Sequence, residues 1–366
     1  MKLEDLGWNN FFQQHFETYH KHDLIPARVV QEHKNIYFVL SETDELTAKV
    51  TGKMHYNAQG YSDYPAVGDW VAIKALPGEG SGTIQAILPR QTKFSRKAVL
   101  SGGMPETGGK VEEQIIAANI DTVFLVSGLD NDFNLRRIER YAAVAWDSGA
   151  VPVVVLNKID LCNNIDSVIQ EVETTIFGIS VLPVSAANNE GLDNFSRYLD
   201  KGKTVTFLGS SGVGKSTIIN RLIGYDHFKT NAVREHDHKG RHTTTHREMI
   251  LLPTGGLIID TPGMREIQVW NADEGISRTF EDIEKLAEKC RFNNCQHANE
   301  PGCVVQQAIE KGDLDTKRFQ NFLKLQRELQ HLEDRQMQKG RQSTKVQWEK
   351  EIAKFSRQMK KNNHKA

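Results

Sequence analysis

The sequence predicts a multidomain α/β protein: a small five-stranded β-barrel, then a doubly wound, mostly parallel sheet, then a helical C-terminal region. Three observations lead to this fold class. Short alternating apolar stretches fill residues 27–94, strands and helices alternate over residues 121–260, and a cysteine-rich segment follows in a helical context. With 366 residues, the chain is long enough for two or three domains.

Composition is ordinary for a globular protein, with a formal net charge of −1. The sequence has no apolar run long enough to span a membrane, and its first twenty residues carry acids and amides where a signal peptide needs apolar residues. We therefore expect a cytoplasmic protein that has no membrane partner. Three of the four cysteines lie within residues 290–303, and in a reducing compartment this grouping indicates a metal site rather than disulfides.

The N-terminal part, residues 1–26, is interpreted as a helical extension. Its apolar residues recur at helical spacing over residues 3–20, which predicts a helix packed on the next domain rather than an aromatic binding site. Residues 27–98 contain five short strands separated by turn residues, which suits a closed barrel of the oligonucleotide-binding (OB) type. The scattered lysines and arginines of this barrel fit either a solvated face or a nucleic-acid-binding surface. The predicted strands are ARVVQEH, NIYFVLS, LTAKVTG, DWVAIKA and GTIQAIL.

Residues 99–111 are predicted to be a flexible linker because SGGMPETGGK is rich in glycine. The domain that follows, residues 112–270, alternates apolar strands with amphipathic helices, which is typical of a doubly wound sheet. Ligands of such sheets bind at the carboxyl ends of the strands. Strands are predicted at 121–128, 151–158, 179–186, 204–208, 249–252 and 257–260, and helices at 134–149, 165–178, 192–200 and 215–223.

The segment TVTFLGSSGVGKST, residues 204–217, contains the G-x-x-x-x-G-K-[ST] pattern between a strand and a helix. Glycines let backbone N–H groups turn toward phosphate oxygens, and the helix start adds further donors. Lys215 would neutralise the β- and γ-phosphates and Ser216 would hold Mg²⁺. The alternative is an ordinary glycine-rich turn. The predicted phosphate-binding residues are Gly209, Ser210, Ser211, Gly212, Val213, Gly214, Lys215, Ser216 and Thr217.

The motif Asn157-Lys158-Ile159-Asp160, at a predicted strand end, indicates which base is bound. The Asp160 carboxylate can accept hydrogen bonds from guanine N1–H and N2–H₂, a donor pair that adenine lacks. The stem of Lys158 can lie along the base. Ser185-Ala186-Ala187 ends the next strand, where its backbone N–H groups can meet guanine O6.

Asp260-Thr261-Pro262-Gly263 ends another apolar strand. Asp260 is placed to hold Mg²⁺ through a water, and the Gly263 N–H to meet the γ-phosphate. The polar loop 224–245 ends in three threonines, of which we expect Thr244 to supply a second hydroxyl to Mg²⁺. Loss of the γ-phosphate would release both loops.

These motifs come in a rotated order, because the base-reading motif precedes the phosphate loop. Together with the barrel before them and the cysteine cluster after them, over about residues 27–310, they resemble the circularly permuted ribosome small-subunit-dependent GTPases (RsgA family). The resemblance implies a GTPase stimulated by the small ribosomal subunit, which binds 16S-type rRNA and acts late in maturation. Met264 stands where many GTPases carry a water-orienting Gln. The resemblance implies that His242 takes that role, beside Lys215 and Gly263.

The pattern Cys290-x₄-Cys295-x-His297-x₅-Cys303 matches a closed structural zinc site with three thiolates and one imidazole. The alternative is three reduced, buried cysteines and a chance histidine. A second metal site among the histidines of residues 236–246 is disfavoured because a mobile loop makes a poor cage. The zinc-binding helical domain is predicted over residues 271–335.

The last stretch, residues 336–366, is predicted to be a basic tail. Over residues 341–366, eight lysines and arginines stand against two glutamates, 8 − 2 = +6. Such a run is either a solvated tail or a contact to rRNA phosphates.

We therefore expect a monomeric GTP hydrolase, cycling between GTP and GDP, whose nucleotide state is coupled to the zinc domain. A nucleotide-gated RNA-binding module with incidental hydrolysis remains as an alternative, as do an ATP-using P-loop enzyme and a translation factor that acts on whole ribosomes.

Overall fold

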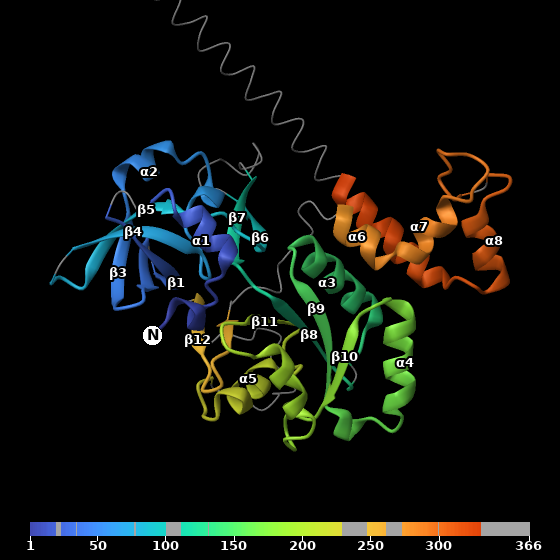
Figure 1. Ribbon diagram of the computed structural model, residues 1–366. Coiled ribbons are helices and arrows are strands. Elements are labelled where there is room, and N and C mark those ends of the chain that lie inside the picture. Colours follow the sequence, from blue (N-terminus) through green and yellow to red (C-terminus); the bar gives the residue numbers. More distant parts are fainter. Residues whose placement is uncertain are drawn as a thin grey trace, which may run out of the picture.

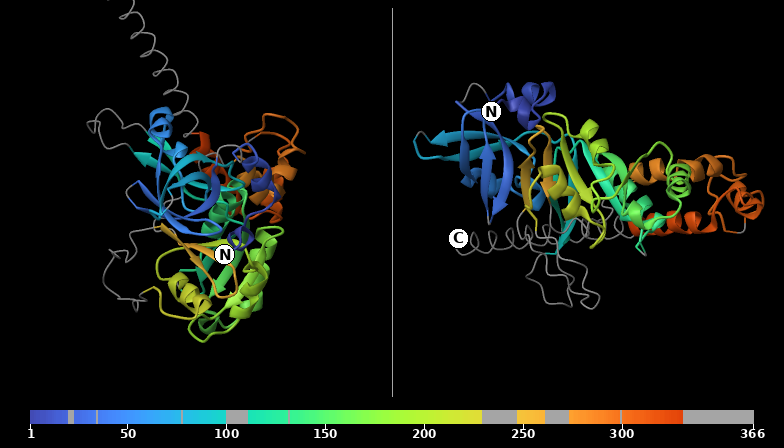
Figure 2. Two further views of the ribbon diagram at one scale, coloured as in Figure 1. Left: turned by 60° about the vertical axis from the view of Figure 1, so that its left-hand side comes forward. Right: turned by 90° about the horizontal axis from the view of Figure 1, so that it is seen from below.

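The structure is a computed structural model of the chain. It describes residues 1–19, 23–33, 35–76, 78–99, 111–130, 132–228, 247–260, 273–298 and 300–330. Figure 2 shows the barrel and the C-terminal helices at opposite ends of the molecule, with the parallel sheet between them. Among these residues, no helix is both long and apolar enough to cross a membrane.

The N-terminal extension contains two short helices, η1 (Leu3–Leu6) and α1 (Asn10–Phe16), rather than the single helix expected over residues 3–20. Gly7 separates them with a φ of +86°, and a Cβ there would lie 2.7 Å from the Gly202 backbone oxygen. A left-handed turn and a close backbone approach both favour glycine at this position. The apolar side chains of the extension pack on the barrel, as expected, in one cluster with Trp70 and Leu88.

The barrel has the five strands that the sequence predicts, and along β2, β3 and β5 buried residues alternate with more exposed ones. The strand β1 pairs with both β2 and β4, and this double pairing closes the barrel in the order β1-β2-β3-β5-β4. Only the β3–β5 pair is parallel. The OB-type barrel is therefore confirmed. The strands are β1 (Ile25–His33), β2 (Ile36–Leu40), β3 (Glu45–Val50), β4 (Trp70–Leu76) and β5 (Ser81–Ile87), with α2 (Gly52–Asn57) and η3 (Tyr61–Asp63) between β3 and β4.

The second sheet is doubly wound and mostly parallel, as predicted. Its order is β10-β9-β8-β11-β13-β12, in which β12 alone runs antiparallel to its neighbour. The central strands β8, β9 and β11 are buried on both faces and are therefore almost continuously apolar. The six strands of the sheet are β8 (Thr122–Gly128), β9 (Val151–Asn157), β10 (Ser180–Val184), β11 (Thr204–Leu208), β12 (Arg247–Leu251) and β13 (Leu257–Asp260).

Helices cover both faces of this sheet (Figure 1). The helices α3 (Leu135–Asp147) and α4 (Ile165–Thr175) pack on one face, whereas α5 (Lys215–Ile223) and η6 (Leu192–Tyr198) pack on the other. The helix predicted over residues 192–200 is a 3₁₀ helix from Leu192 to Tyr198.

The barrel and the parallel sheet share one continuous sheet of eleven strands. The strand β1 pairs antiparallel with β12, so that Gln31 lies opposite Glu248 and Glu32 lies opposite Arg247. Arg247 and Glu32 also form an ion pair at 3.4 Å. Figure 1 shows β12 beside the lower end of the barrel. No pattern in the sequence predicts this junction.

A two-stranded ribbon was also missed. The strands β6 (Lys93–Val99) and β7 (Val111–Ala118) pair antiparallel, with Lys93 opposite Ala118 and Val99 opposite Val111. The segment predicted as a linker therefore joins two paired strands, although residues 100–110 themselves lie outside the described residues. The domain boundaries stay predictions.

The C-terminal helices α6 (Asp273–Thr279), α7 (Glu281–Ala287) and α8 (Val304–Lys311) precede a helix over residues 316–330. Their apolar side chains belong to the same buried cluster as those of α3. The apolar residues Phe319, Phe322, Leu323, Leu325 and Leu329 recur at helical spacing, which agrees with this last helix, and residues 331–366 lie outside the described residues. The basic tail lies outside the described residues.

Candidate functional site

The phosphate loop connects the buried strand β11 to α5, as the sequence predicts. Two of its glycines have no room for a side chain. A Cβ on Gly209 would lie 2.3 Å from the Val126 backbone oxygen, and one on Gly214 would lie 2.1 Å from Nδ2 of Asn157. The ammonium group of Lys215 donates to the backbone oxygens of Gly209 and Ser210 at 2.8 and 2.6 Å. The lysine thus lies over the loop that would hold the phosphates.

Asn157 joins three loops at the carboxyl edge of the sheet. Its Nδ2 donates to the Val213 backbone oxygen at 2.8 Å, and its Oδ1 accepts from the Ala186 N–H at 3.1 Å. The side chain is buried at the end of β9, with 2% of the residue exposed. The binding of nucleotide by Asn157 stays a prediction, and the contacts show that its side chain also clamps the phosphate loop to the segment after β10.

Asp160 lies in a short 3₁₀ turn, η5 (Ile159–Leu161), directly after Lys158. The Ser185 hydroxyl donates to its Oδ1 at 2.5 Å. Lys158 has a left-handed backbone with a φ of +66°, and its ammonium group pairs with Asp130 in the loop after β8. The structure therefore brings Asn157, Lys158, Asp160 and Ser185 together, and it adds Asp130, which no sequence motif indicates.

The residues expected at the magnesium side are described only in part. Asp260 ends β13 and Ser216 lies in the first turn of α5, so both lie at the carboxyl ends of the neighbouring parallel strands β13 and β11. Such edges are where ligands of doubly wound sheets bind. His242, Thr244 and Gly263 lie outside the described residues, and their roles stay predictions.

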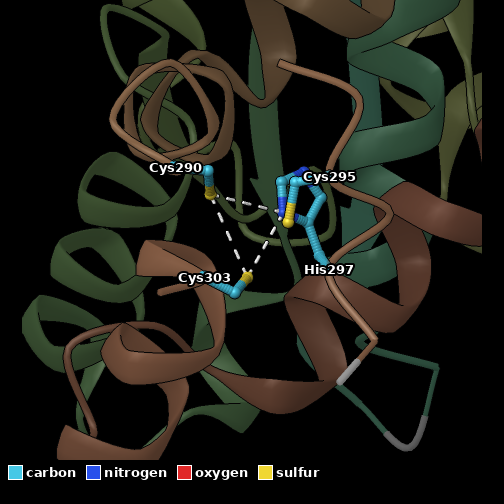
Figure 3. Close-up of side chains that lie close together, drawn as sticks. All are labelled: Cys290, Cys295, His297 and Cys303. Carbon is cyan, nitrogen blue, oxygen red and sulfur yellow. Dashed lines mark hydrogen bonds between the residues drawn. The ribbon is translucent and has the colours of Figure 1, made fainter. Parts of the chain in front are cut away.

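The three cysteines and the histidine of the C-terminal region form one cluster (Figure 3). Their ligand atoms all lie within 4.8 Å of one another, and Nδ1 of His297 lies 3.6 Å from Sγ of Cys290 and 3.5 Å from Sγ of Cys303. A tetrahedral ion bound at about 2.3 Å to sulfur and about 2.0 Å to nitrogen separates its ligand atoms by roughly 3.5 to 3.8 Å. The two His297 distances match these values, and the 4.0 Å between Sγ of Cys290 and Sγ of Cys303 is slightly longer, so that a metal ion fits after a small contraction of the cluster.

The surroundings of the cluster favour the metal-binding forms of Cys290 and His297 but not that of Cys295, because burial raises the pKa of the Cys295 thiol to about 11. Burial opposes the thiolate of Cys290, but the backbone N–H groups of Val305 and Val304, together with hydrogen bonds from Cys303 and Cys295, outweigh it and hold the pKa of that thiol below its usual value. Burial also lowers the pKa of His297, which keeps the imidazole neutral. A metal ligand must be a thiolate or a neutral imidazole.

Comparison with known proteins agrees with this geometry. A family model described as RsgA GTPase matches residues 87–270. The protein of Opitutus terrae named small ribosomal subunit biogenesis GTPase RsgA is 47% identical over 337 residues, 90% of each chain. The crystal structure of YjeQ from Thermotoga maritima superposes with a TM-score of 0.60 at 26% identity, covering 84% of this chain and 98% of that one. The structure of YloQ, described as a circularly permuted GTPase, supports the fold with a TM-score of 0.59 at 23% identity, covering 87% and 98%. The chain therefore belongs to the RsgA GTPase family.

Proposed function

We propose that this chain is a Mg²⁺-dependent, cytoplasmic and monomeric GTP hydrolase that binds the small ribosomal subunit and its 16S-type rRNA and acts late in that subunit's maturation. The names of curated relatives, small ribosomal subunit biogenesis GTPases, support the role in the small subunit. The observation that carries the proposal is that the phosphate loop, Asn157 and the Asp160–Ser185 pair converge at one sheet edge.

In the proposed complex, Asp160 accepts the N1–H and N2–H₂ groups of guanine, and the stem of Lys158 lies along the base. The Ala186 N–H is engaged by Asn157, so we assign the contact to guanine O6 to the N–H of Ala187. The glycine-rich loop surrounds the β- and γ-phosphates with backbone N–H groups.

Hydrolysis is the attack of a water on the γ-phosphate, and charge spreads over the phosphate oxygens as the bond to the leaving GDP breaks. Lys215 stabilises that charge, and His242 orients the attacking water through its imidazole. The Gly263 N–H meets the γ-phosphate. Mg²⁺, when bound by Ser216, Thr244 and Asp260, supplies further neutralisation.

We further propose that the cluster of Cys290, Cys295, His297 and Cys303 holds one structural Zn²⁺ and that nucleotide state is coupled to this region. The closed set of three sulfurs and one nitrogen supports zinc. The short connection from Asp260 to α6, which begins at Asp273, supports the coupling.

The proposal is tested by measuring GTP hydrolysis while purified small ribosomal subunits are titrated into the wild type and a Lys215→Ala variant. We expect the subunits to accelerate hydrolysis by the wild type and not by the variant. The matched control is Lys203→Ala, which removes an exposed lysine just before β11, the strand whose other end leads into the phosphate loop. Equal rates with and without subunits would contradict the proposal.

The rival function, a nucleotide-gated RNA-binding module with incidental hydrolysis, is favoured by one observation. Met264 follows Gly263 where a glutamine would orient water, and methionine has no group able to do so. Single-turnover hydrolysis separates the two functions, because the rival predicts no acceleration when small subunits are present although RNA binding still depends on the nucleotide.

A further inference from the structure

The loop after β8 places a carboxylate directly on the lysine of the base-reading motif. Oδ2 of Asp130 forms an ion pair with Nζ of Lys158, and 31% and 24% of the two side chains are exposed. We propose that Asp130 is a positioning residue for guanine recognition, which acts by holding the stem of Lys158 where the base binds. This inference rests on the proposed binding of guanine nucleotides and names a residue that the base-reading motif does not contain.

Lys158 needs such a partner because its own geometry does not fix the side chain. A lysine side chain has a flexible stem of four carbons, and it loses rotational freedom when it is held against a ligand. Its backbone is already fixed in the left-handed region and follows Asn157, whose side chain is clamped on both sides. Only the far end of the lysine remains to be positioned, and the ion pair with Asp130 does this before any nucleotide binds.

Asp130 is itself held in place. Its Oδ1 accepts a hydrogen bond from the Asp132 N–H at 3.1 Å, which leaves Oδ2 for the lysine. Gly128, the last residue of β8, makes room for both side chains. A Cβ at this position would lie 2.9 Å from Oδ1 of Asp130 and 3.5 Å from Cδ of Lys158. Burial opposes the charge of Asp130, but the hydrogen bonds from Lys158 and from the Asp132 N–H prevail and lower the pKa of Asp130.

The pairing also gives the two lysines of the site different tasks. The ammonium group of Lys215 lies against carbonyl oxygens of the phosphate loop, where it can turn to a phosphate. The charge of Lys158 is compensated by the carboxylate of Asp130. Its contribution to binding is therefore made by the apolar stem along the base. Loss of Asp130 should then weaken the binding of GDP and of GTP equally, so that its effect on hydrolysis appears in KM rather than in kcat.

The test is the dissociation constant of a fluorescent GDP for four proteins: wild type, Asp130→Ala, Lys158→Ala and the double variant. We expect Asp130→Ala to weaken binding roughly tenfold, the scale of a charge-assisted contact. In the Lys158→Ala background the same change should alter the dissociation constant less than about twofold, because coupled residues are not additive. In GTP hydrolysis, the effect of Asp130→Ala should appear as a higher KM rather than as a lower kcat, because the residue acts on the binding of the base.

The matched control is Asp121→Ala. Asp121 lies just before β8, at the other end of that strand, and forms a comparable ion pair with Lys203 at 3.0 Å. It should leave GDP affinity unchanged. Asp130→Asn, which keeps the size of the side chain, replaces Asp130→Ala if the latter fails to fold.

Three results would overturn the inference. Unchanged affinity of Asp130→Ala would show that the pair has no role in binding, whereas a tenfold loss that persists without Lys158 would show that Asp130 acts by another route. In both cases the wild type still binds GDP and the proposed function stands. If the wild type fails to bind GDP, the proposed function and this inference both fail.

Discussion

Oε1 of Glu139 lies 2.6 Å from Nη1 of Arg318, and 0% and 7% of the two side chains are exposed. Glu139 lies on α3, which packs on the parallel sheet, and Arg318 lies on the helix over residues 316–330. Arg318 also donates to both carboxylate oxygens of Asp282 at 2.9 and 2.6 Å and to the Thr279 backbone oxygen at 2.9 Å. One guanidinium therefore joins the C-terminal helices to the helix that follows the Asp130 loop.

Replacing Arg318 by alanine should destabilise the protein strongly. The variant leaves the buried Glu139 carboxylate with Arg136 and Asn321 as remaining partners, at 2.7 and 2.6 Å. Breaking a buried ion pair on one side costs about 3 kcal/mol. The measurement is the free energy of unfolding in urea.

The control is Lys285→Ala, which removes an exposed ion pair with Glu281 at 2.6 Å. Exposed pairs of this spacing contribute about 0.5 kcal/mol or less. Equal unfolding free energies for the Arg318 and Lys285 variants would show that the buried pair does not hold the C-terminal helices in place.

Two glycines of the phosphate loop offer a matched comparison. Gly214→Ala adds a Cβ at 2.1 Å from Asn157 in a backbone with a φ of +98°, whereas Gly212→Ala adds one with no heavy atom within 4 Å at a φ of +78°. Both variants carry the left-handed strain of about 1 kcal/mol. Only Gly214→Ala should also displace Asn157, and we therefore expect it to lose at least about tenfold more GDP affinity than Gly212→Ala. Titration with GDP measures the difference, and equal losses would argue against the clamp.

The elements that the sequence predicted are those with a local signal. The strands of the barrel alternate apolar and polar residues, the strands of the parallel sheet are apolar throughout, and the phosphate loop and the cysteine cluster have a fixed spacing. Asp160 and Ser185 could be brought together from sequence because both follow parallel strands, whose carboxyl ends meet at one edge.

The features that were missed have no local signal. The pairing of Gln31 with Glu248 joins residues far apart in the chain, and β-strand register of this kind depends on the tertiary structure. The strands β6 and β7 lie on either side of the glycine-rich linker, and neither was predicted because charged residues interrupt the apolar ones in both. Asp130 lies in a loop, where nothing in the sequence indicates that its carboxylate reaches Lys158.

The base specificity should change with Asp160→Asn. The Ser185 hydroxyl donates to Oδ1 of residue 160 at 2.5 Å, so the new amide would keep its oxygen toward Ser185 and offer Nδ2 to the base. Xanthine accepts at O2, where guanine donates from N2. We expect the preference for GTP over XTP to fall by at least about 100-fold, because an unpaired polar group discriminates strongly.

Hydrolysis of GTP and XTP at low substrate gives this ratio directly. Asp166→Asn, an exposed aspartate in the first turn of α4, should keep the wild-type preference. If Asp160→Asn keeps the wild-type preference for GTP over XTP, the base does not bind at Asp160.

The metal site predicts one zinc per chain, bound through Cys303. Cys303→Ser should lose the metal and lower the unfolding midpoint of the C-terminal helices, because metal binding contributes folding free energy. Cys162→Ser removes the one cysteine outside the cluster and should keep both metal and stability. Elemental analysis of the purified proteins measures the metal. If the purified wild type held no metal and unfolded at the same midpoint as Cys303→Ser, a structural role for a metal ion in this cluster would be ruled out.

Acid should lower the free energy of unfolding of the metal-free protein through His297. Burial favours the neutral imidazole of His297, so the pKa of the folded chain lies below the ordinary 6.5. As the pH falls through 6.5, the unfolded chain takes up a proton that the folded chain resists. The contribution of His297 to stability is therefore complete above pH 6.5, and it is lost as the pH falls toward the lower pKa that His297 has in the folded chain. Urea unfolding from about pH 7.5 to about pH 5 measures this slope. His297→Asn should reduce it, and His15→Asn, on the exposed side of α1, should not; equal slopes in all three proteins would contradict the assignment.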